Sequence, residues 1–158
     1  MVGYIRVPFV PTPPPVVNAM LKIAKVGSDD ILYDLGCGDG RIPIMAVELF
    51  NVKKAVCVEI RDDLYKRALE EVKKRGLEGR VVVINDDMFN VDVSEATVIT
   101  LFLLTAVNKE LRPKLERELR KGARVVSHEF EIPGWRPAKV VIYYDGIINH
   151  KIYLYIKE

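Results

Sequence analysis

The chain has 158 residues, the length of one domain, and we treat residues 1–158 as a single domain. Its formal net charge of +2 is too small to indicate the strongly basic face of a protein that reads nucleic acid directly. No apolar run approaches the ~20 residues that a membrane span needs. The first residues lack the pattern of a secretory signal peptide, so we expect a cytoplasmic protein without a membrane partner.

Two further features of the composition concern the environment of the protein. The two cysteines, Cys37 and Cys57, are too few for a disulfide framework, so we expect free thiols in a reducing compartment. The chain has no glutamine and is rich in Glu, Lys and Arg. Because hyperthermophile proteins show this bias, the composition favours a thermophilic source.

The predicted elements alternate between helix and strand along the chain. A proline-rich stretch at 9–17 leads into an amphipathic helix at 16–25, and proline suits a helix start. Further helices are expected at 41–50, at 61–76 and around Leu111, Leu115 and Leu119. Strands are expected at 31–35, 54–59, 80–84, 96–103 and 124–127, and a hairpin around the turn at 145–146 closes the chain with runs at 139–144 and 151–157.

This alternation predicts an α/β fold. Continuous apolar strands separated by helices are typical of a parallel sheet covered on both faces. The final hairpin adds antiparallel strands, giving a seven-stranded, mostly parallel, Rossmann-like sheet. Ligands of such sheets bind beyond the carboxyl ends of the strands, where the strand order reverses. We therefore look for functional residues at those ends.

A glycine-rich loop, DLGCGDG at 34–40, follows the first predicted strand. Glycine permits a tight turn and a close approach of the backbone to a ligand. The second predicted strand ends in Glu59, about 20 residues further on, where a carboxylate can bind ribose hydroxyls. A glycine loop alone would also fit a simple turn, but loop, acid and strand context together predict a nucleoside-binding site.

Carboxylates near the predicted strand ends indicate which nucleoside binds. They are Asp34, Asp39, Glu59, Asp86 and Asp87. They would repel a pyrophosphate, and the G-x-G-x-G spacing departs from the dinucleotide pattern G-x-G-x-x-G. A ligand with an ammonium and a sulfonium group would be attracted. The sequence therefore predicts S-adenosyl-L-methionine as cofactor, and the glycine motif is similar to that of seven-strand methyltransferases.

Each part of this cofactor has a predicted partner. Asp34 and the backbone of Gly36 and Gly38 would hold the methionine end, and Glu59 the ribose. Ile60 and Met88 would sandwich the adenine, although core filling would explain Met88 equally well. Asp87 would bind the adenine amino group. The complete predicted cofactor set is Thr12, Asp34, Gly36, Gly38, Gly40, Glu59, Ile60, Asp86, Asp87, Met88 and Thr100.

The predicted acceptor side is apolar. The segment TLFLL at 100–104 lacks the Asn/Asp-Pro-Pro-aromatic loop of enzymes that methylate base amino groups. His128 and His150 are the only histidines and have no ligand spacing, so we predict no metal site. An apolar channel suits a lysine side chain, and desolvation by aromatic walls lowers the pKa of its amine. The candidate walls are Phe9, Phe102, Phe130 and Trp135.

Four segments resemble the archaeal broad-specificity protein-lysine methyltransferases, small relatives of the histone-lysine methyltransferases without a SET domain. The segments are PFVPTPPPVVNAML, YDLGCGDGRI, VITLFLLTAVN and RVVSHEFEIPGW, and the resemblance covers nearly the whole chain. It implies a broad-specificity protein-lysine N-methyltransferase that acts on exposed lysines of small basic chromatin proteins and of itself. Eukaryotic relatives end the fourth strand in Asn-x-Phe-x-Phe. Here Thr100 stands at the position of the Asn and Phe102 at that of the first Phe, but Leu104 replaces the second Phe, a departure from the histone enzymes.

Members of this family use the proline-rich leader as a cover. The resemblance thus implies that residues 1–15 form a flap that brings Phe9 and Thr12 over the methyl end of the cofactor. Glu129 follows the fifth strand and would orient an incoming ammonium group, unless it is a solvated loop acid. The predicted catalytic set is Phe9, Thr12, Thr100, Phe102 and Glu129, in a monomer. Two alternatives stay open: a methyltransferase acting on RNA or a small molecule, and a non-catalytic cofactor-binding module.

Overall fold

The computed structural model describes residues 9–158, and the part of the predicted flap at 1–8 lies outside them. It contains a seven-stranded sheet in the order β3-β2-β1-β4-β5-β7-β6. The strands are β1 (Ile31–Leu35), β2 (Lys54–Val58), β3 (Val81–Ile84), β4 (Val98–Leu101), β5 (Arg124–His128), β6 (Lys139–Tyr144) and β7 (Asn149–Ile156). The first five strands are parallel, whereas β7 is antiparallel to both β5 and β6. The predicted fold class is confirmed.

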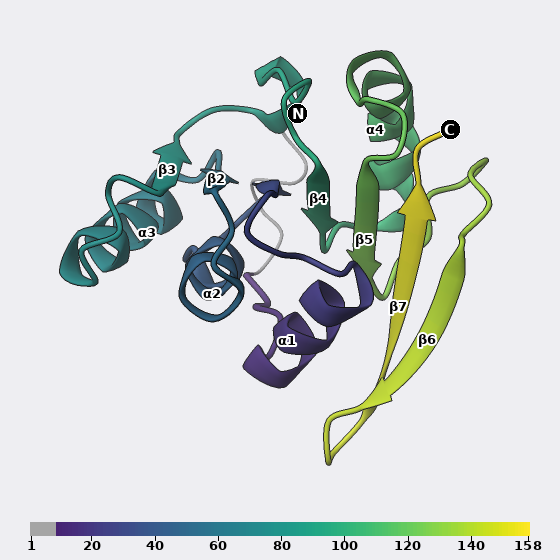
Figure 1. The fold of residues 1–158 in the computed structure, drawn as a ribbon, viewed down its shortest axis with the longest axis horizontal. Coiled ribbons are helices and arrows are strands. Elements are labelled where there is room, and N and C mark those ends of the chain that lie inside the picture. The colour runs from purple at the N-terminus through teal and green to yellow at the C-terminus, as the bar shows by residue number, and fades with distance from the viewer. Residues whose placement is uncertain (1–8) are drawn as a thin grey trace.

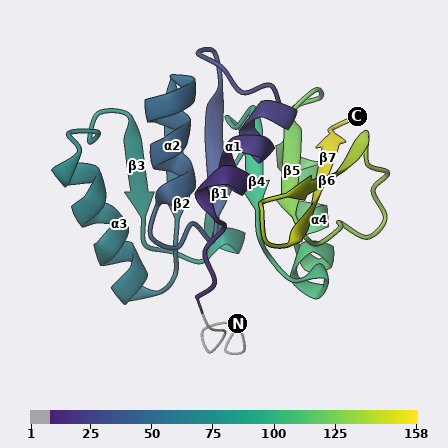
Figure 2. The same cartoon turned by 90° about the horizontal axis from the view of Figure 1, so that it is seen from below.

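Helices cover both faces of the sheet, as Figures 1 and 2 show. They are α1 (Pro14–Ile23), α2 (Arg41–Phe50), α3 (Asp62–Lys74) and α4 (Thr105–Glu118), with a short 3₁₀ helix, η2 (Met88–Asn90). One core cluster joins α1 and α2 to the sheet, and a second cluster joins α4 and η2 to the opposite face. This is the layered arrangement that buried parallel strands require.

Helix α1 places the proline-rich stretch at the ligand side of the sheet. It begins at Pro14, two residues before the predicted start. Proline is tolerated there because the N–H groups of the first turn have no hydrogen-bond partner within the helix. Val16, Val17, Met20 and Leu21 are buried against the sheet. Since this packing fixes the N-terminus of α1, the residues just before Pro14 are held beside the strand ends.

One predicted strand end differs in the structure, and the final hairpin has a feature that was not predicted. Strand β4 ends at Leu101, whereas the apolar run predicted a strand as far as Leu103. Hydrophobicity continues past the strand because Leu103 packs on the core from the following loop. The strands β6 and β7 are longer than the five parallel strands, and their hairpin projects beyond the neighbouring strands (Figure 1).

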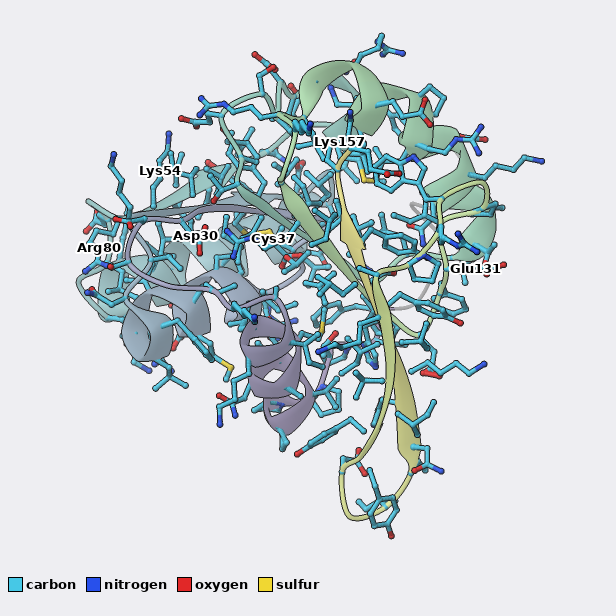
Figure 3. The ribbon with its side chains drawn as sticks, turned by 45° about the vertical axis from the view of Figure 1, so that its right-hand side comes forward. Asp30, Cys37, Lys54, Arg80, Glu131 and Lys157 are labelled. Carbon is cyan, nitrogen blue, oxygen red and sulfur yellow. A yellow bond between two sulfur atoms is a disulfide. The ribbon has the colours of Figure 1, made fainter. Side chains whose placement is uncertain are left out.

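The prediction of two free thiols is wrong. Cys37 and Cys57 form a disulfide, with their Cα atoms 5.2 Å apart. Figure 3 labels Cys37 and draws sulfur bonds in yellow. Cys57 lies on β2 and Cys37 in the loop after the neighbouring β1, and the loop N–H groups of Gly36 and Cys37 both donate to the carbonyl of Val58. Adjacent parallel strands therefore bring the two sulfurs together, which a count of cysteines does not reveal.

The disulfide is expected to stabilise the glycine loop and the fold. Closing a chain segment with a sequence separation of 20 contributes about 3 kcal/mol in the loop-entropy description. We expect the double variant Cys37→Ala/Cys57→Ala to unfold at a lower denaturant concentration by a comparable free energy. Chemical denaturation with and without a phosphine reductant measures this. Reductant should destabilise the wild type and leave the double variant unchanged; equal unfolding midpoints for the oxidised and reduced wild type would contradict the expectation.

Candidate active site

A cavity of about 350 Å³ lies at the carboxyl ends of the central strands. Strand β1 pairs with β2 on one side and with β4 on the other, so the strand order reverses there. This is the position at which α/β sheets bind their ligands. Most of the predicted site residues line this one cavity, namely Phe9, Thr12, Asp34, Gly36, Gly38, Glu59, Ile60, Asp86, Met88, Phe102 and Phe130.

Glu59 ties the glycine loop to the end of β2. Its Oε1 accepts a hydrogen bond from the N–H of Gly38 at 2.8 Å, and its Oε2 accepts from the N–H of Arg61 at 3.0 Å. The carboxylate is buried but still borders the cavity. Each oxygen retains a lone pair, so the group is held in place for two adjacent hydroxyls such as those of a ribose.

Asp34 is a buried carboxyl group at the end of β1. Its Oδ1 accepts a hydrogen bond from Thr100 Oγ1 at 2.9 Å. Burial raises the pKa of Asp34 to about 7, against the lowering effect of the Thr100 hydrogen bond, and the nearby Glu59 and Asp39 carboxylates raise it further. In the protein alone, the cavity therefore contains a carboxyl group that is only partly ionised at neutral pH. A cationic ligand would favour its ionised form.

The residues before α1 cover one side of the cavity. Phe9 packs on Gly38 so closely that a Cβ atom at this glycine would lie 2.3 Å from the phenyl ring. The Arg67 guanidinium lies 5.8 Å from the centre of the same ring. Arg41, paired with Asp39 at 2.8 Å, donates a hydrogen bond to the carbonyl of Thr12 at 3.3 Å. The stretch is thus fastened to the glycine loop at two points.

Aromatic side chains form another part of the cavity wall. The rings of Phe102 and Phe130 stack with their centres 6.2 Å apart, and both line the cavity. The prediction that Trp135 joins them is wrong. Its ring packs against Tyr155 and its Nε1–H donates to Glu116 at 3.1 Å, away from the cavity.

Four predicted site residues do not line the cavity. Gly40 has a φ of 85° and begins α2, where it packs against Ala68 rather than a ligand. Asp87 caps η2 by accepting from the N–H of Phe89 at 3.0 Å. Thr100 is fully buried behind Asp34. The backbone N–H of Glu129 donates to the carbonyl of Lys151 on β7, and its side chain is on that side, not at the cavity.

Other residues that line the cavity were not predicted as site residues. They include Val10, Pro11, Arg41, Leu103, Leu104 and Val107. The apolar members carry no signal in sequence, because they look like ordinary core positions. Arg41 directly follows the glycine motif, and this position was the one available clue.

The two histidines meet, although 22 residues separate them. His128 Nε2 lies 2.8 Å from His150 Nδ1, and a carboxylate oxygen of Glu129 lies within 4.8 Å of both side chains. In the β5–β7 pairing His128 is opposite Ile152, so His150 is its diagonal neighbour on the same face. Their spacing along the chain gave no sign of this contact, because antiparallel pairing brings distant positions together.

Comparison with known proteins identifies the fold family. The family model described as the ANTKMT methyltransferase domain matches residues 34–139. The chain belongs to this methyltransferase family. Among the described residues of this methyltransferase, 9–158, no helix is long and apolar enough to cross a membrane.

Several relatives and structures resemble the methyltransferase. A protein-lysine N-methyltransferase of the archaeon Saccharolobus islandicus is 59% identical over 96% of this chain and 94% of its own length. The adenine nucleotide translocase lysine N-methyltransferase of mouse is 31% identical over 87% of this chain but only 59% of its own length. The crystal structure of an RNA methyltransferase from Salinibacter ruber with S-adenosyl-L-homocysteine has a TM-score of 0.87 and 44% identity, covering 93% of each chain. The predicted cofactor, S-adenosyl-L-methionine, and the predicted resemblance are confirmed.

The raised pKa of Asp34 predicts pH-dependent cofactor binding. Below about pH 7 the carboxyl group is mostly protonated and cannot attract the cation, so the dissociation constant should fall about tenfold between pH 6 and pH 8. Without cofactor the same shift lowers stability as the pH rises from 3.8 to about 7. Asp34→Asn should bind weakly at every pH, without this slope, and the exposed control Asp29→Asn should match the wild type. Calorimetric titration at several pH values measures the cofactor dissociation constants of the wild type and of both variants. A wild-type dissociation constant that does not change with pH would contradict the assignment of Asp34.

Proposed function

We propose that this methyltransferase is a protein-lysine N-methyltransferase of broad sequence specificity. The observation that carries the proposal is the apolar, aromatic wall formed by Phe102 and Phe130 beside the cavity. Such a wall accepts the long aliphatic stem of lysine. The similarity to the Saccharolobus enzyme supports the same acceptor.

The chemistry required is the placement of a neutral amine against the sulfonium methyl group. A lysine of pKa ~10.4 is mostly protonated at pH 7, and deprotonation costs roughly 4–5 kcal/mol. Positioning of the two reactants can lower the barrier by about 7–11 kcal/mol in favourable cases, which offsets that cost. Burial beside aromatic rings also lowers the pKa of the amine.

The cofactor assignments are part of the proposal. Glu59 binds the ribose hydroxyls, Asp34 the methionine ammonium, and Ile60 and Met88 contact the adenine. The stretch before α1 serves as the cover, because Phe9 and Thr12 line the cavity together with Phe102. The helices and strands of residues 9–158 all belong to one sheet and the layers that cover it, so within these residues no separate substrate-recognition domain narrows the choice of protein. Monomeric state, cytoplasmic location and small basic chromatin substrates stay predictions.

RNA is the second candidate acceptor, since the 44% identical Salinibacter structure is called an RNA methyltransferase. Two features of the present chain favour lysine over RNA. The net charge is only +2, and the loop after β4 is apolar rather than of the type that binds base amino groups.

Labelled cofactor distinguishes these acceptors. We expect label from S-adenosyl-L-methionine to appear on lysines of small basic proteins, and of the enzyme itself, when the products are analysed by peptide mass spectrometry. Total RNA should remain unlabelled in parallel reactions. Label on RNA with none on lysine would refute the proposal, and cofactor binding without label anywhere would favour a non-catalytic module.

A substitution in the aromatic wall separates binding from transfer. Phe102→Ala should leave the cofactor dissociation constant near the wild-type value, because the ring borders the acceptor side. Transfer to lysine should fall by roughly ten- to a hundredfold, since a misplaced amine loses the benefit of positioning. Phe50→Ala, at the end of α2 and outside the cavity, is the control for lost packing. Equal turnover by Phe102→Ala and the wild type would show that the acceptor does not lie against this ring.

A further inference from the structure

A line of hydrogen-bonding side chains runs from the cavity to the turn of the β6–β7 hairpin. Thr12 Oγ1 lies 3.1 Å from His128 Nδ1, His128 Nε2 lies 2.8 Å from His150 Nδ1, and His150 Nε2 lies 2.7 Å from Asp145 Oδ2. Thr12 lines the cavity, and Asp145 sits at the far end of the projecting hairpin, which Figure 1 shows. The four groups belong to three separate parts of the chain: the stretch before α1, the end of β5, and the hairpin.

The direction of every hydrogen bond in this line follows from Asp145. Its carboxylate can only accept, so His150 carries its proton on Nε2 and its Nδ1 is an acceptor. His128 must then donate from Nε2, and its Nδ1 accepts from the hydroxyl of Thr12. The oxygen of Thr12 therefore keeps its lone pairs for a donor in the cavity.

The charge states favour movement of a proton away from the cavity. The N–H of Ile148, the His150 side chain and the N–H of Ile147 lower the pKa of Asp145 to about 2, so it stays an anion. Burial, with a contribution from His150, lowers the pKa of His128 to about 4, so this ring passes a proton on rather than keeping it. His150 is the ring that contacts the Asp145 carboxylate, at 2.7 Å.

The surroundings of the line keep it separate from water. His128 and His150 are buried, and the ring of Phe102 packs on His128 with centres 4.1 Å apart. Among the described residues, the other ionisable groups near the line are Arg41 at Thr12, Glu129 after β5, and Tyr143 and Lys151 on the hairpin. None of these four donates to or accepts from the two rings.

We propose that this line, Thr12–His128–His150–Asp145, is the general base of the reaction. The proposal rests on the lysine acceptor of the proposed function. An N–H bond of the bound ammonium breaks as Thr12 Oγ1 takes the proton, the hydroxyl proton moves to His128 Nδ1, and the Nε2 proton of His128 moves to His150. His150 becomes an imidazolium beside Asp145. The freed lone pair of the amine attacks the sulfonium methyl, the C–S electrons stay on sulfur, and His150 later releases its proton at the hairpin.

The line gives the reaction a distinctive pH profile. When the enzyme itself stores the proton, the transfer rate should change little between about pH 7 and 9. Without the line, the proton must leave to solvent before attack, and the rate should rise about tenfold for each pH unit. The ratio of the wild-type rate to the rate of a variant without the line thus decreases as the pH increases. If the line had a purely structural role, this ratio would not change with pH.

Asp145→Asn tests the line at a surface turn. The amide oxygen can still accept from the N–H groups of Ile147 and Ile148, so the turn is retained, but the amide nitrogen cannot accept from His150. We expect single-turnover transfer to a lysine peptide to be roughly a hundredfold slower at pH 7 and close to the wild type at pH 9. Asp92→Asn is the matched control, because Asp92 is an exposed turn carboxylate that caps Ser94 and touches neither ring.

A second pair of variants tests the cavity end of the same line. Thr12→Val removes the hydroxyl and should acquire the steep pH profile, whereas Thr12→Ser keeps the hydroxyl and should retain the flat one. The cofactor dissociation constant of Asp145→Asn should equal that of the wild type. A wild-type enzyme that labels no lysine defeats the proposed function, whereas lysine transfer with parallel pH profiles for wild type and Asp145→Asn defeats the proton line alone.

A metal centre at the two histidines is the competing interpretation of this cluster, and a separate measurement tests it. The side chains of His128, Glu129 and His150 are close enough to share a cation. We expect the purified enzyme to contain no stoichiometric zinc, by elemental analysis, and to keep its transfer rate in a chelator. Bound zinc together with loss of transfer on chelation would overturn the proton line.

Discussion

The two-sided pairing of β1 is the constraint on which the site depends. The strands β2 and β4 lie on opposite sides of β1, so the connections after β1 and after β4 lead away from each other. A cavity remains between them at the end of the sheet. The last residues of these strands then determine its chemistry. Asp34 borders the cavity as a buried group, Glu59 holds the glycine loop, and Phe102 lines the cavity just after β4. The position of the site thus follows from this reversal.

The cavity is lined both by carboxyl groups and by aromatic rings. Burial raises the pKa of Asp34 to about 7, and a bound cation would favour its ionised form. In the proposed function, the carboxyl groups would attract the cofactor and the rings of Phe102 and Phe130 would weaken the hydration of an incoming ammonium group. The two environments would then assist the two reactants of a methyl transfer in different ways.

Two cross-connections bind the site to distant parts of the fold. The disulfide joins the glycine loop to β2, and the Thr12–His128–His150–Asp145 line joins the stretch before α1 to the hairpin. Disulfides do occur in intracellular proteins of hyperthermophiles, which agrees with the glutamine-free composition. Thr12 and the residues beside it are therefore held at the cavity by contacts with α2 and β5, and their proline content limits the entropy lost in holding them.

The sequence alone determined the strand–helix alternation, the parallel sheet, the glycine loop, its companion Glu59 and the cofactor class. These depend on local spacing along single strands and loops, which the sequence displays directly. Only the tertiary structure decided that Cys37 meets Cys57, that Trp135 and Glu129 lie away from the cavity, and that His128 meets His150. Such contacts depend on the register between strands that are far apart in the chain, and no local pattern encodes that register.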